Sequence, residues 1–358
     1  MSSMQKYLAA AKANKNNAQQ VIIGNEAADL DSMASAITYG CLLSEKDADA
    51  VVLPVMPIPR ADFKLRTEAV YVFQEAGINL EDLVFFDEVD FGKLMAADAG
   101  LVLVDHNKLG PTLEKYNSNV SAVLDHHNDE GMYEDAAPRK IRLVGSTTTL
   151  VAEEFSRTGV EIEEDTAILL AGTILLDTVN LAPEAGRVTG ADIEAAEKLL
   201  PLCSLSRQEF FDNIQREKFS VTGLSTGDLL RKDYKQFQFE TVRCGISSAL
   251  LPVSQWQELD NDLLSGFMTY AASCELEVLL SMNAYTNPDF NRDLVIYCRT
   301  KEGHDNLLAC LQNNSLDLTP IEYPGQQEKG GVFISFHRQG NLGISRKKLQ
   351  PLLAEFYQ

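Results

Sequence analysis

The sequence is poor in several residue types, and each shortage excludes a class of protein. Six cysteines are spread over 358 residues without a Cys-x-x-Cys pair, so neither a zinc knuckle nor a dense disulfide framework is indicated. Runs of about 18 uninterrupted apolar residues are absent, and residues 1–20 lack the apolar core of a signal peptide. We therefore expect a soluble, cytoplasmic protein with no membrane partner.

Positive charge is also scarce. The chain has 31 Lys and Arg against 52 Asp and Glu, which gives a formal net charge of -21. This balance opposes attraction to nucleic acid or to an anionic surface, so we expect no nucleic-acid partner. An anionic substrate would need a local basic pocket.

Apolar content is sufficient for two packed domains, since 45% of the residues are hydrophobic. In the N-terminal half, β-type apolar runs alternate with helical patterns, which predicts an α/β domain whose mainly parallel sheet is flanked by helices. These runs lie at 21–24, 51–57, 83–86, 100–106 and 121–127. Apolar spacing from Met33 to Cys41 predicts a helix after the first strand, so residues 25–31 form a strand-to-helix loop.

Helix-breaking residues between about 183 and 210 predict a linker, although residues 191–200 could form a short helix within it. We place a catalytic domain at 1–190, the linker at 191–210 and a smaller α/β domain at 211–358. Further helices are expected at 147–158 and 165–178 in the first domain, and near 206–219, 253–270, 303–312 and 346–356 beyond it. Strands of the second domain are expected at 241–250, 277–283, 293–299 and 331–337.

Acidic residues stand directly after three predicted strands, where ligands bind in open α/β sheets. They are Asp29 with Asp31, Asp105, and the triplet 125–127, Asp-His-His. At one rim these groups repel one another unless cations neutralise them, which predicts a dinuclear site for Mg²⁺ or Mn²⁺. A single Asp after a strand is more often a turn or helix cap, and the triplet alone could be a solvated loop.

The remaining histidines are weaker candidates. His106 could be a metal ligand or could orient its loop, and both alternatives stay open. His304 and His337 are isolated in the sequence, so we expect positions that bind no metal.

Four segments together resemble the DHH phosphoesterase superfamily: 24–32, 104–107, 124–127 and 175–178. Three later segments are similar to the branch that carries a DHHA2 domain: 232–237, 245–248 and 340–348. That branch includes family II inorganic pyrophosphatases, exopolyphosphatases and prune-like proteins. The resemblance covers nearly the whole chain and implies an N-terminal DHH domain followed by a DHHA2 domain.

The resemblance implies a role for each acidic position. Asp29 is similar to a ligand of the first metal, Asp31 to a ligand of the second, and Asp105 to the carboxylate that bridges both. His126 and Asp177 resemble further ligands of the second metal.

Other positions resemble groups around the metals. His127 matches a histidine that contacts the bound phosphate, and Asp125 resembles the aspartate that holds the loop and the histidine tautomer. Near the C-terminus Arg346 and Lys347 resemble a phosphate-binding element, and Arg338 is a further candidate for substrate binding.

Basic residues without a family role are open to both interpretations. Lys329 and Lys348 add to the C-terminal basic group, which could be only a solvated helix start. The segment 60–66 contributes Arg60, Lys64 and Arg66, which could form a second basic ledge or a plain surface.

Asn25 decides between branches. Family II pyrophosphatases have His where this chain has Asn25, whereas the exopolyphosphatase and prune branches resemble the local Gly-Asn-Glu. The substitution favours an exopolyphosphatase-like enzyme, with Asn25 beside the substrate and a greater tolerance for Mg²⁺.

The resemblance implies release of orthophosphate from inorganic, short-chain polyphosphate by two-metal, in-line attack of a bridging hydroxide. Asp105, His127, Arg346 and Lys347 would carry the catalysis, with hinge motion about 183–210. Alternatives are a manganese-dependent pyrophosphatase, a prune-like phosphodiesterase, and an interaction protein with a vestigial metal site. The assembly state stays open, with a homodimer among the alternatives.

Overall fold

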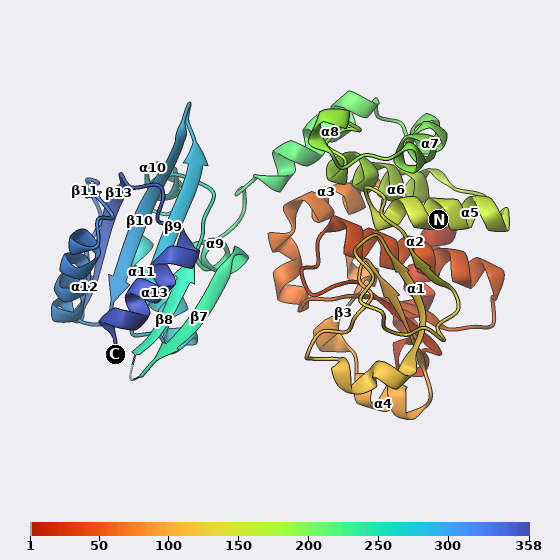
Figure 1. The fold of residues 1–358 in the computed structure, drawn as a ribbon, viewed down its shortest axis with the longest axis horizontal. Coiled ribbons are helices and arrows are strands. Elements are labelled where there is room, and N and C mark those ends of the chain that lie inside the picture. Colours follow the sequence, from red (N-terminus) through yellow and green to blue (C-terminus); the bar gives the residue numbers. More distant parts are fainter. Residues whose placement is uncertain (1, 241) are drawn as a thin grey trace. The chain divides into compact units, whose positions relative to one another are not determined.

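The computed structural model describes residues 2–240 and 242–358. The chain divides into two compact units, residues 1–220 and 221–358 (Figure 1). Each unit has its own sheet and its own buried core. No helix among the described residues is long and apolar enough to cross a membrane.

A six-stranded parallel sheet forms the centre of the first unit, in the order β3-β2-β1-β4-β5-β6. The prediction of a mainly parallel sheet is confirmed. The strands are β1 Gln20–Ile23, β2 Val52–Met56, β3 Val84–Phe85, β4 Gly100–Val104, β5 Val120–Asp125 and β6 Arg139–Ile141. Strand β6 was not predicted, because its residues are polar and half-buried at the sheet edge.

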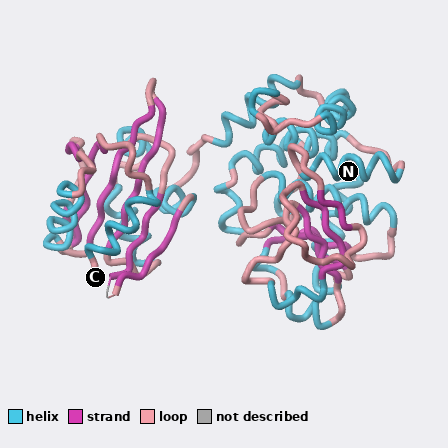
Figure 2. The backbone as a smooth tube through the Cα atoms, in the orientation of Figure 1, coloured by secondary structure: helices cyan, strands magenta, loops and turns pink. Residues whose placement is uncertain are grey.

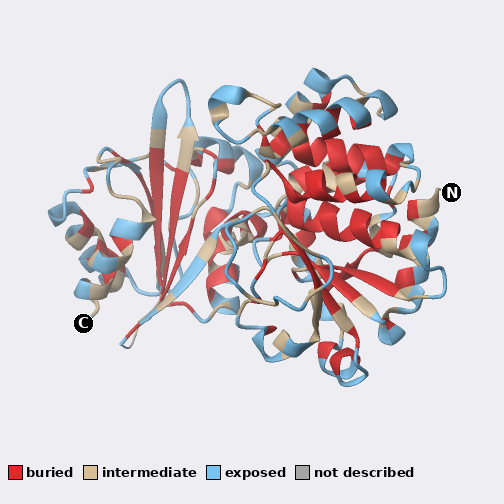
Figure 3. Ribbon diagram, turned by 45° about the vertical axis from the view of Figure 1, so that its right-hand side comes forward, coloured by how far each residue is buried: buried red, intermediate tan, exposed pale blue. Residues whose placement is uncertain are grey.

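Helices cover this sheet, and two of them, α2 and α6, are buried along most of their length. Residues 30–42 of α2 and 165–176 of α6 are buried, as expected for helices packed on several sides (Figure 3). The helices are α1 Ser3–Ala13, α2 Leu30–Lys46, α3 Thr67–Glu75, α4 Phe91–Ala96, α5 Thr147–Thr158, α6 Glu164–Asp177, α7 Gly190–Leu199 and α8 Arg207–Lys218. Helix α1 was missed because its weak amphipathic pattern is rich in alanine and lysine.

The segment expected to be a linker is instead part of the first unit. Residues 190–199 form α7, which packs against α5 and α6, and α8 begins at Arg207. The two units divide at 220/221, later than the predicted 191–210. Proline and glycine mark short turns between helices here, and the hinge motion about 183–210 stays a prediction.

The second unit contains a mixed sheet in the order β11-β13-β10-β9-β8-β7, with β12 paired to β13 (Figure 2). Strands β8 and β9 are parallel, and their neighbours pair in antiparallel fashion. The strands are β7 Tyr234–Phe239, β8 Val242–Ser247, β9 Val278–Thr286, β10 Phe290–Cys298, β11 Leu318–Pro320, β12 Glu328–Lys329 and β13 Val332–Gln339.

Two hydrophobic clusters belong to this second sheet. The helices are α9 Thr226–Lys232, α10 Val253–Leu259, α11 Leu263–Ser273, α12 Lys301–Asn313 and α13 Arg346–Phe356. The single helix expected at 253–270 is two helices, because Asp262 leaves the helical conformation and caps α11 by accepting a hydrogen bond from Ser265 N.

Candidate metal centre

The predicted acidic groups meet at the carboxyl edge of the parallel sheet. Strands β1, β4 and β5 are neighbours, and the strand order reverses between β1 and β4. The loop before α2 follows β1, Asp105 follows β4, and the triplet 125–127 ends β5. An open α/β sheet binds its ligands at such a reversal, because the loops part there.

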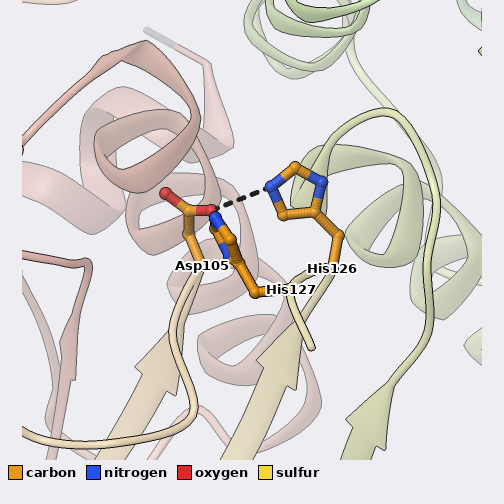
Figure 4. Close-up of side chains that lie close together, drawn as sticks. All are labelled: Asp105, His126 and His127. Atoms are coloured by element: carbon orange, nitrogen blue, oxygen red, sulfur yellow. Dashed lines mark ion pairs between the residues drawn. The ribbon is translucent and has the colours of Figure 1, made fainter. Parts of the chain in front are cut away.

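Asp105 lies at the centre of the group. Its side chain is 2% exposed, and its backbone φ of +61° is uncommon for a residue with a side chain. Oδ2 accepts hydrogen bonds from the Asn25 amide and the Ser32 hydroxyl, both at 2.7 Å. Oδ1 lies 3.2 Å from His126 Nε2 and 3.7 Å from His127 Nδ1 (Figure 4). These three side chains offer ligand atoms within 4.8 Å of one another.

Asp31 is buried against the first turn of α5. Oδ1 accepts hydrogen bonds from the Ser146 hydroxyl at 2.8 Å and from Thr148 N at 3.0 Å, and Oδ2 accepts one from Thr147 N at 2.7 Å. A carboxylate is stabilised there by the unpaired amides and the positive end of the helix dipole. Sequence reasoning missed this anchor, although a Ser-Thr-Thr sequence at the predicted helix start was a usable signal.

His126 presents one nitrogen to the carboxylates. Nδ1 lies 3.0 Å from the Val144 carbonyl oxygen, while Nε2 lies 3.2 Å from Asp105 Oδ1 and 3.7 Å from Asp31 Oδ2. Metal-binding histidines are commonly oriented by such a hydrogen bond from the other ring nitrogen. Burial lowers the pKa of His126, but the hydrogen bond to Asp105 and the charge of Asp31 together raise it to about 10.

Asp177 and Asp29 complete the predicted ligand set. Asp177 ends α6, and its Oδ2 is buried without a hydrogen-bond partner. Asp29 caps α2, with its Oδ1 accepting a hydrogen bond from Ser32 N at 3.1 Å. The four carboxylates influence one another. Burial, and then the negative charges of Asp31, Asp29 and Asp105, raise the pKa of Asp177 well above its usual value.

This arrangement fits divalent cations. Burial and then the charge of Asp105 raise the pKa of Asp31 to about 7, which measures how unfavourable several bare carboxylates are at one edge. A cation would relieve that repulsion and would give Asp177 Oδ2 a partner. Carboxylate oxygens with one or two imidazoles suit Mg²⁺ or Mn²⁺.

His127 faces outward and is held by Asp125. The His127 side chain is 56% exposed, and its Nδ1 lies 2.8 Å from Asp125 Oδ1. Asp125 is fully buried and also accepts hydrogen bonds from His127 N at 3.2 Å and from the Asn107 amide at 2.5 Å. The hydrogen bond to Asp125 raises the pKa of His127. The geometry therefore leaves Nε2 of His127 available to an anion.

The Asn25 side chain is hydrogen-bonded to Asp105. Its amide nitrogen donates to Asp105 Oδ2 at 2.7 Å and to the Asp105 carbonyl at 3.1 Å, and its Oδ1 accepts from Ala27 N at 2.8 Å. Both polar ends of this side chain are therefore used within the protein. Asn25 therefore supports Asp105, and its assignment to substrate binding stays a prediction.

Arg66 was considered as part of a basic ledge but supports the metal-binding loop. Arg66 Nε donates a hydrogen bond to the Ala28 carbonyl at 3.1 Å, and Arg66 Nη2 donates one to the Ala27 carbonyl at 2.9 Å. Arg60 pairs with Glu88 and stacks over Phe85. Both guanidinium groups are therefore bonded within the protein, and a role of this segment in substrate binding stays a prediction.

The C-terminal candidates lie in the second unit. Arg346 begins α13 and pairs with Asp233 at 2.7 Å, and Lys347 is exposed. Arg338 Nε lies 2.5 Å from Asp293 Oδ1, and 47% of the Arg338 side chain is exposed, so its assignment to substrate binding stays a prediction. Lys329 lies beside Ser265 at the opposite end of β13 from Arg338, so these basic residues do not form one group.

The remaining histidines divide between a cavity and a core. His106 places Nδ1 2.9 Å from the Val104 carbonyl and lines a cavity of about 500 Å³ together with Asn25 and Phe86. His304 and His337 both contact the Ser335 hydroxyl, at 2.6 and 2.8 Å, inside the second unit.

Comparisons with known proteins agree with this arrangement. The model of the DHH family N-terminal domain matches residues 19–174, and the DHHA2 domain model matches 212–356. The protein named exopolyphosphatase PRUNE1 is 33% identical over 364 residues in both Rattus norvegicus and Homo sapiens, covering 98% of this chain and 79% of each relative.

A more distant relative comes from an archaeon. The manganese-dependent inorganic pyrophosphatase of Methanothrix thermoacetophila is 28% identical over 228 residues, which cover 63% of this chain and 68% of that protein. The two domain models match the chain one after the other, and relatives span both domains. These matches identify the family of the chain. It belongs to the DHH family, in the branch whose members carry a C-terminal DHHA2 domain.

Proposed function

We propose that this protein is a divalent-metal-dependent phosphoanhydride hydrolase that releases orthophosphate from short inorganic polyphosphates. The observation that carries the proposal is the convergence of Asp31, Asp105 and His126 beside Asp177, whose buried Oδ2 has no partner. Relatives named exopolyphosphatase and manganese-dependent pyrophosphatase support the same chemistry.

We assign two cations to five residues: Asp29, Asp31, Asp105, His126 and Asp177. When bound, such cations polarise a phosphoryl oxygen and lower the pKa of a bound water. The protein's own part is to hold these ligands apart in fixed directions. Asn25 and Ser32 fix Asp105, and the first turn of α5 fixes Asp31.

His127 is assigned to the phosphoryl group. Asp125 holds Nδ1, so that the outward Nε2 can donate a hydrogen bond to a phosphoryl oxygen when the ring is protonated, and the raised pKa favours that state. We assign Arg346 and Lys347 of the second unit to binding the anionic oxygens of the polyphosphate. An arginine can bind two such oxygens at once, whereas a lysine supplies a compact charge.

Both Mg²⁺ and Mn²⁺ are expected to support turnover. Asn25 supplies no imidazole to the ligand set, since its polar atoms contact Asp105 and Ala27, and the resulting oxygen-rich site is hard in ligand type. An activity with Mn²⁺ that exceeds the activity with Mg²⁺ by orders of magnitude would contradict this expectation.

The test is phosphate release from pyrophosphate, tripolyphosphate and longer chains, each with Mg²⁺ and with Mn²⁺. We expect the highest kcat/KM with tripolyphosphate or another short chain. Fastest turnover of pyrophosphate would instead assign the activity of the archaeal relative, and a cyclic nucleotide as the preferred substrate would assign a phosphodiesterase. No phosphate release under any condition would leave an interaction protein with a vestigial metal site.

A further inference from the structure

A fully buried carboxylate on α7 lies behind the metal centre. Asp192 is 0% exposed, and its Oδ1 and Oδ2 accept hydrogen bonds from Gly145 N at 3.0 and 2.9 Å. Oδ1 also accepts one from the Thr149 hydroxyl at 2.6 Å, and Oδ2 accepts two from Thr189, from N and from the hydroxyl, at 2.7 Å each. An ionised carboxylate suits this place because it only accepts hydrogen bonds.

The turn that Asp192 holds carries the supports of two candidate ligands. Gly145 lies between Val144, whose carbonyl orients His126, and Ser146, whose hydroxyl donates to Asp31. Both chain neighbours of the anchored residue therefore act on the metal centre.

The same turn also packs closely on the residue after the third ligand, Asp177. A Cβ atom on Gly145 would overlap Thr178 Cγ2 and would lie 2.8 Å from the Arg187 carbonyl oxygen and 2.9 Å from Asp192 Oδ2. Thr178 directly follows Asp177 in the chain. Displacement of the turn is therefore expected to disturb the end of α6.

We propose that Asp192 is a positioning residue for one of the two cations, the one held by Asp31, His126 and Asp177. It acts through the Gly145 turn and touches neither substrate nor cation. Asp29, the ligand assigned to the other cation alone, is held from elsewhere, by Ser32 N. The inference rests on the proposed function, because it requires two cation sites of different composition.

The test is a titration of the metal-free full-length protein with Mn²⁺, in which unbound Mn²⁺ is measured by electron paramagnetic resonance. The Asp192→Asn substitution replaces one carboxylate oxygen by an NH2 group. This group donates hydrogen bonds, whereas the oxygen accepts hydrogen bonds from Gly145 and Thr189. We expect one site to lose about tenfold to a hundredfold in affinity, the range for residues that orient metal ligands, while the other site changes by less than about threefold.

Two variants separate positioning from folding. Thr189→Ala removes one cap contact of α7 but keeps the hydrogen bonds from Gly145 to Asp192, so we expect both sites to remain. Gly145→Ala keeps Asp192 and displaces the turn, so we expect the same selective loss as in Asp192→Asn. Glu194→Gln, on the exposed face of α7 and paired with Lys198, is the matched control and should bind both ions like the parent.

The outcomes separate the proposed function from the positioning role of Asp192. A parent protein that binds no Mn²⁺ would overturn the proposed function. Two sites in the parent, with unchanged affinities in both Asp192→Asn and Gly145→Ala, would overturn the positioning role alone. Equal loss at both sites in these variants would also contradict it, and Gly145→Ala decides the question if Asp192→Asn does not fold.

Discussion

The two units bury similar polar residues but use them differently. In the first unit, parallel strands end at one edge, so Asp105 and His126 from neighbouring strands meet there. In the second unit, antiparallel neighbours send their ends to opposite edges, and buried His304 of α12 and His337 of β13 share the Ser335 hydroxyl between the helix and the sheet. The comparison teaches that strand direction, more than residue type, decides where a site can form.

Two carboxylates make the difference concrete. Both carboxylate oxygens of Asp293 in the second unit have partners, because Asp293 accepts hydrogen bonds from Val253 N and the Tyr285 hydroxyl and pairs with Arg338. Asp177 in the first unit leaves Oδ2 buried and without a partner. A carboxylate with hydrogen-bond partners on both oxygens supports a fold, whereas one without them among other carboxylates favours binding of a cation.

The largest expected effect comes from removing the central carboxylate of the first unit. Asp105→Asn should lower kcat by about a thousandfold or more, because a cation site worth several kcal/mol of charge stabilisation is disrupted. Steady-state phosphate release from tripolyphosphate measures this loss. Asp212→Asn, at an exposed position of α8, should keep parental turnover, and a near-normal kcat in Asp105→Asn would contradict the metal assignment.

A smaller effect is expected in the second unit. Arg346→Ala should raise KM by about tenfold to a hundredfold, with a lesser change in kcat, because one charge-assisted contact to phosphate is lost. The exposed Arg299, which pairs with Glu277, supplies the control Arg299→Ala. If both variants have the same KM, the total positive charge of this unit affects substrate binding, and Arg346 has no specific role.

Arg66 tests how far support of the metal-binding loop matters. Arg66→Gln should weaken Mn²⁺ binding by about tenfold, at the low end for groups that orient ligands, because the Ala27 and Ala28 carbonyls lose their donors. Arg66→Lys should recover part of the affinity. Calorimetric titration with Mn²⁺ measures both, and parental binding in Arg66→Gln would show that the loop needs no such brace.

The smallest effect on turnover is expected from His337, which should instead control the pH dependence of stability. Burial and then His304 lower the pKa of His337 to about 4, whereas an unfolded chain has a value of about 6.5. Between these values the unfolded state binds the proton and the folded state does not, so stability falls as pH drops from about 6.5 to about 4, by about 3 kcal/mol at most.

The fluorescence of Trp256 measures this pH effect, because it is the one tryptophan of the chain and is buried in the second unit. Urea unfolding at pH 7.5 and pH 5 should give a lower midpoint at pH 5. His337→Gln should show a weaker pH dependence, with kcat at neutral pH unchanged. An equal pH dependence in both proteins would assign the effect to other groups.

Much of the first unit could be predicted from the sequence, because apolar strands followed by Asp29, Asp105 and the triplet 125–127 are local signals. The neighbouring order of β1, β4 and β5 then brought them together as expected. Two-domain organisation was also visible, and the mixed sheet of the second unit is consistent with the expected α/β class.

The supports of the site could not be predicted, because they depend on contacts between distant segments. Asp192 is 47 residues from Gly145 and lay in a segment that proline and glycine marked as a linker. The sequence did not show that Arg66 donates to backbone carbonyls or that the Asn25 amide donates to Asp105. Burial of a polar group is a tertiary property that local patterns do not report.

Crystals of the protein grown with Mn²⁺ would reveal the cations by anomalous scattering. We expect two manganese peaks at the carboxyl edge of the parallel sheet, both within bonding distance of Asp105, with Asp177 and His126 bound to one of them. No peak at this edge, or a single peak that leaves Asp177 Oδ2 without a partner, would contradict it.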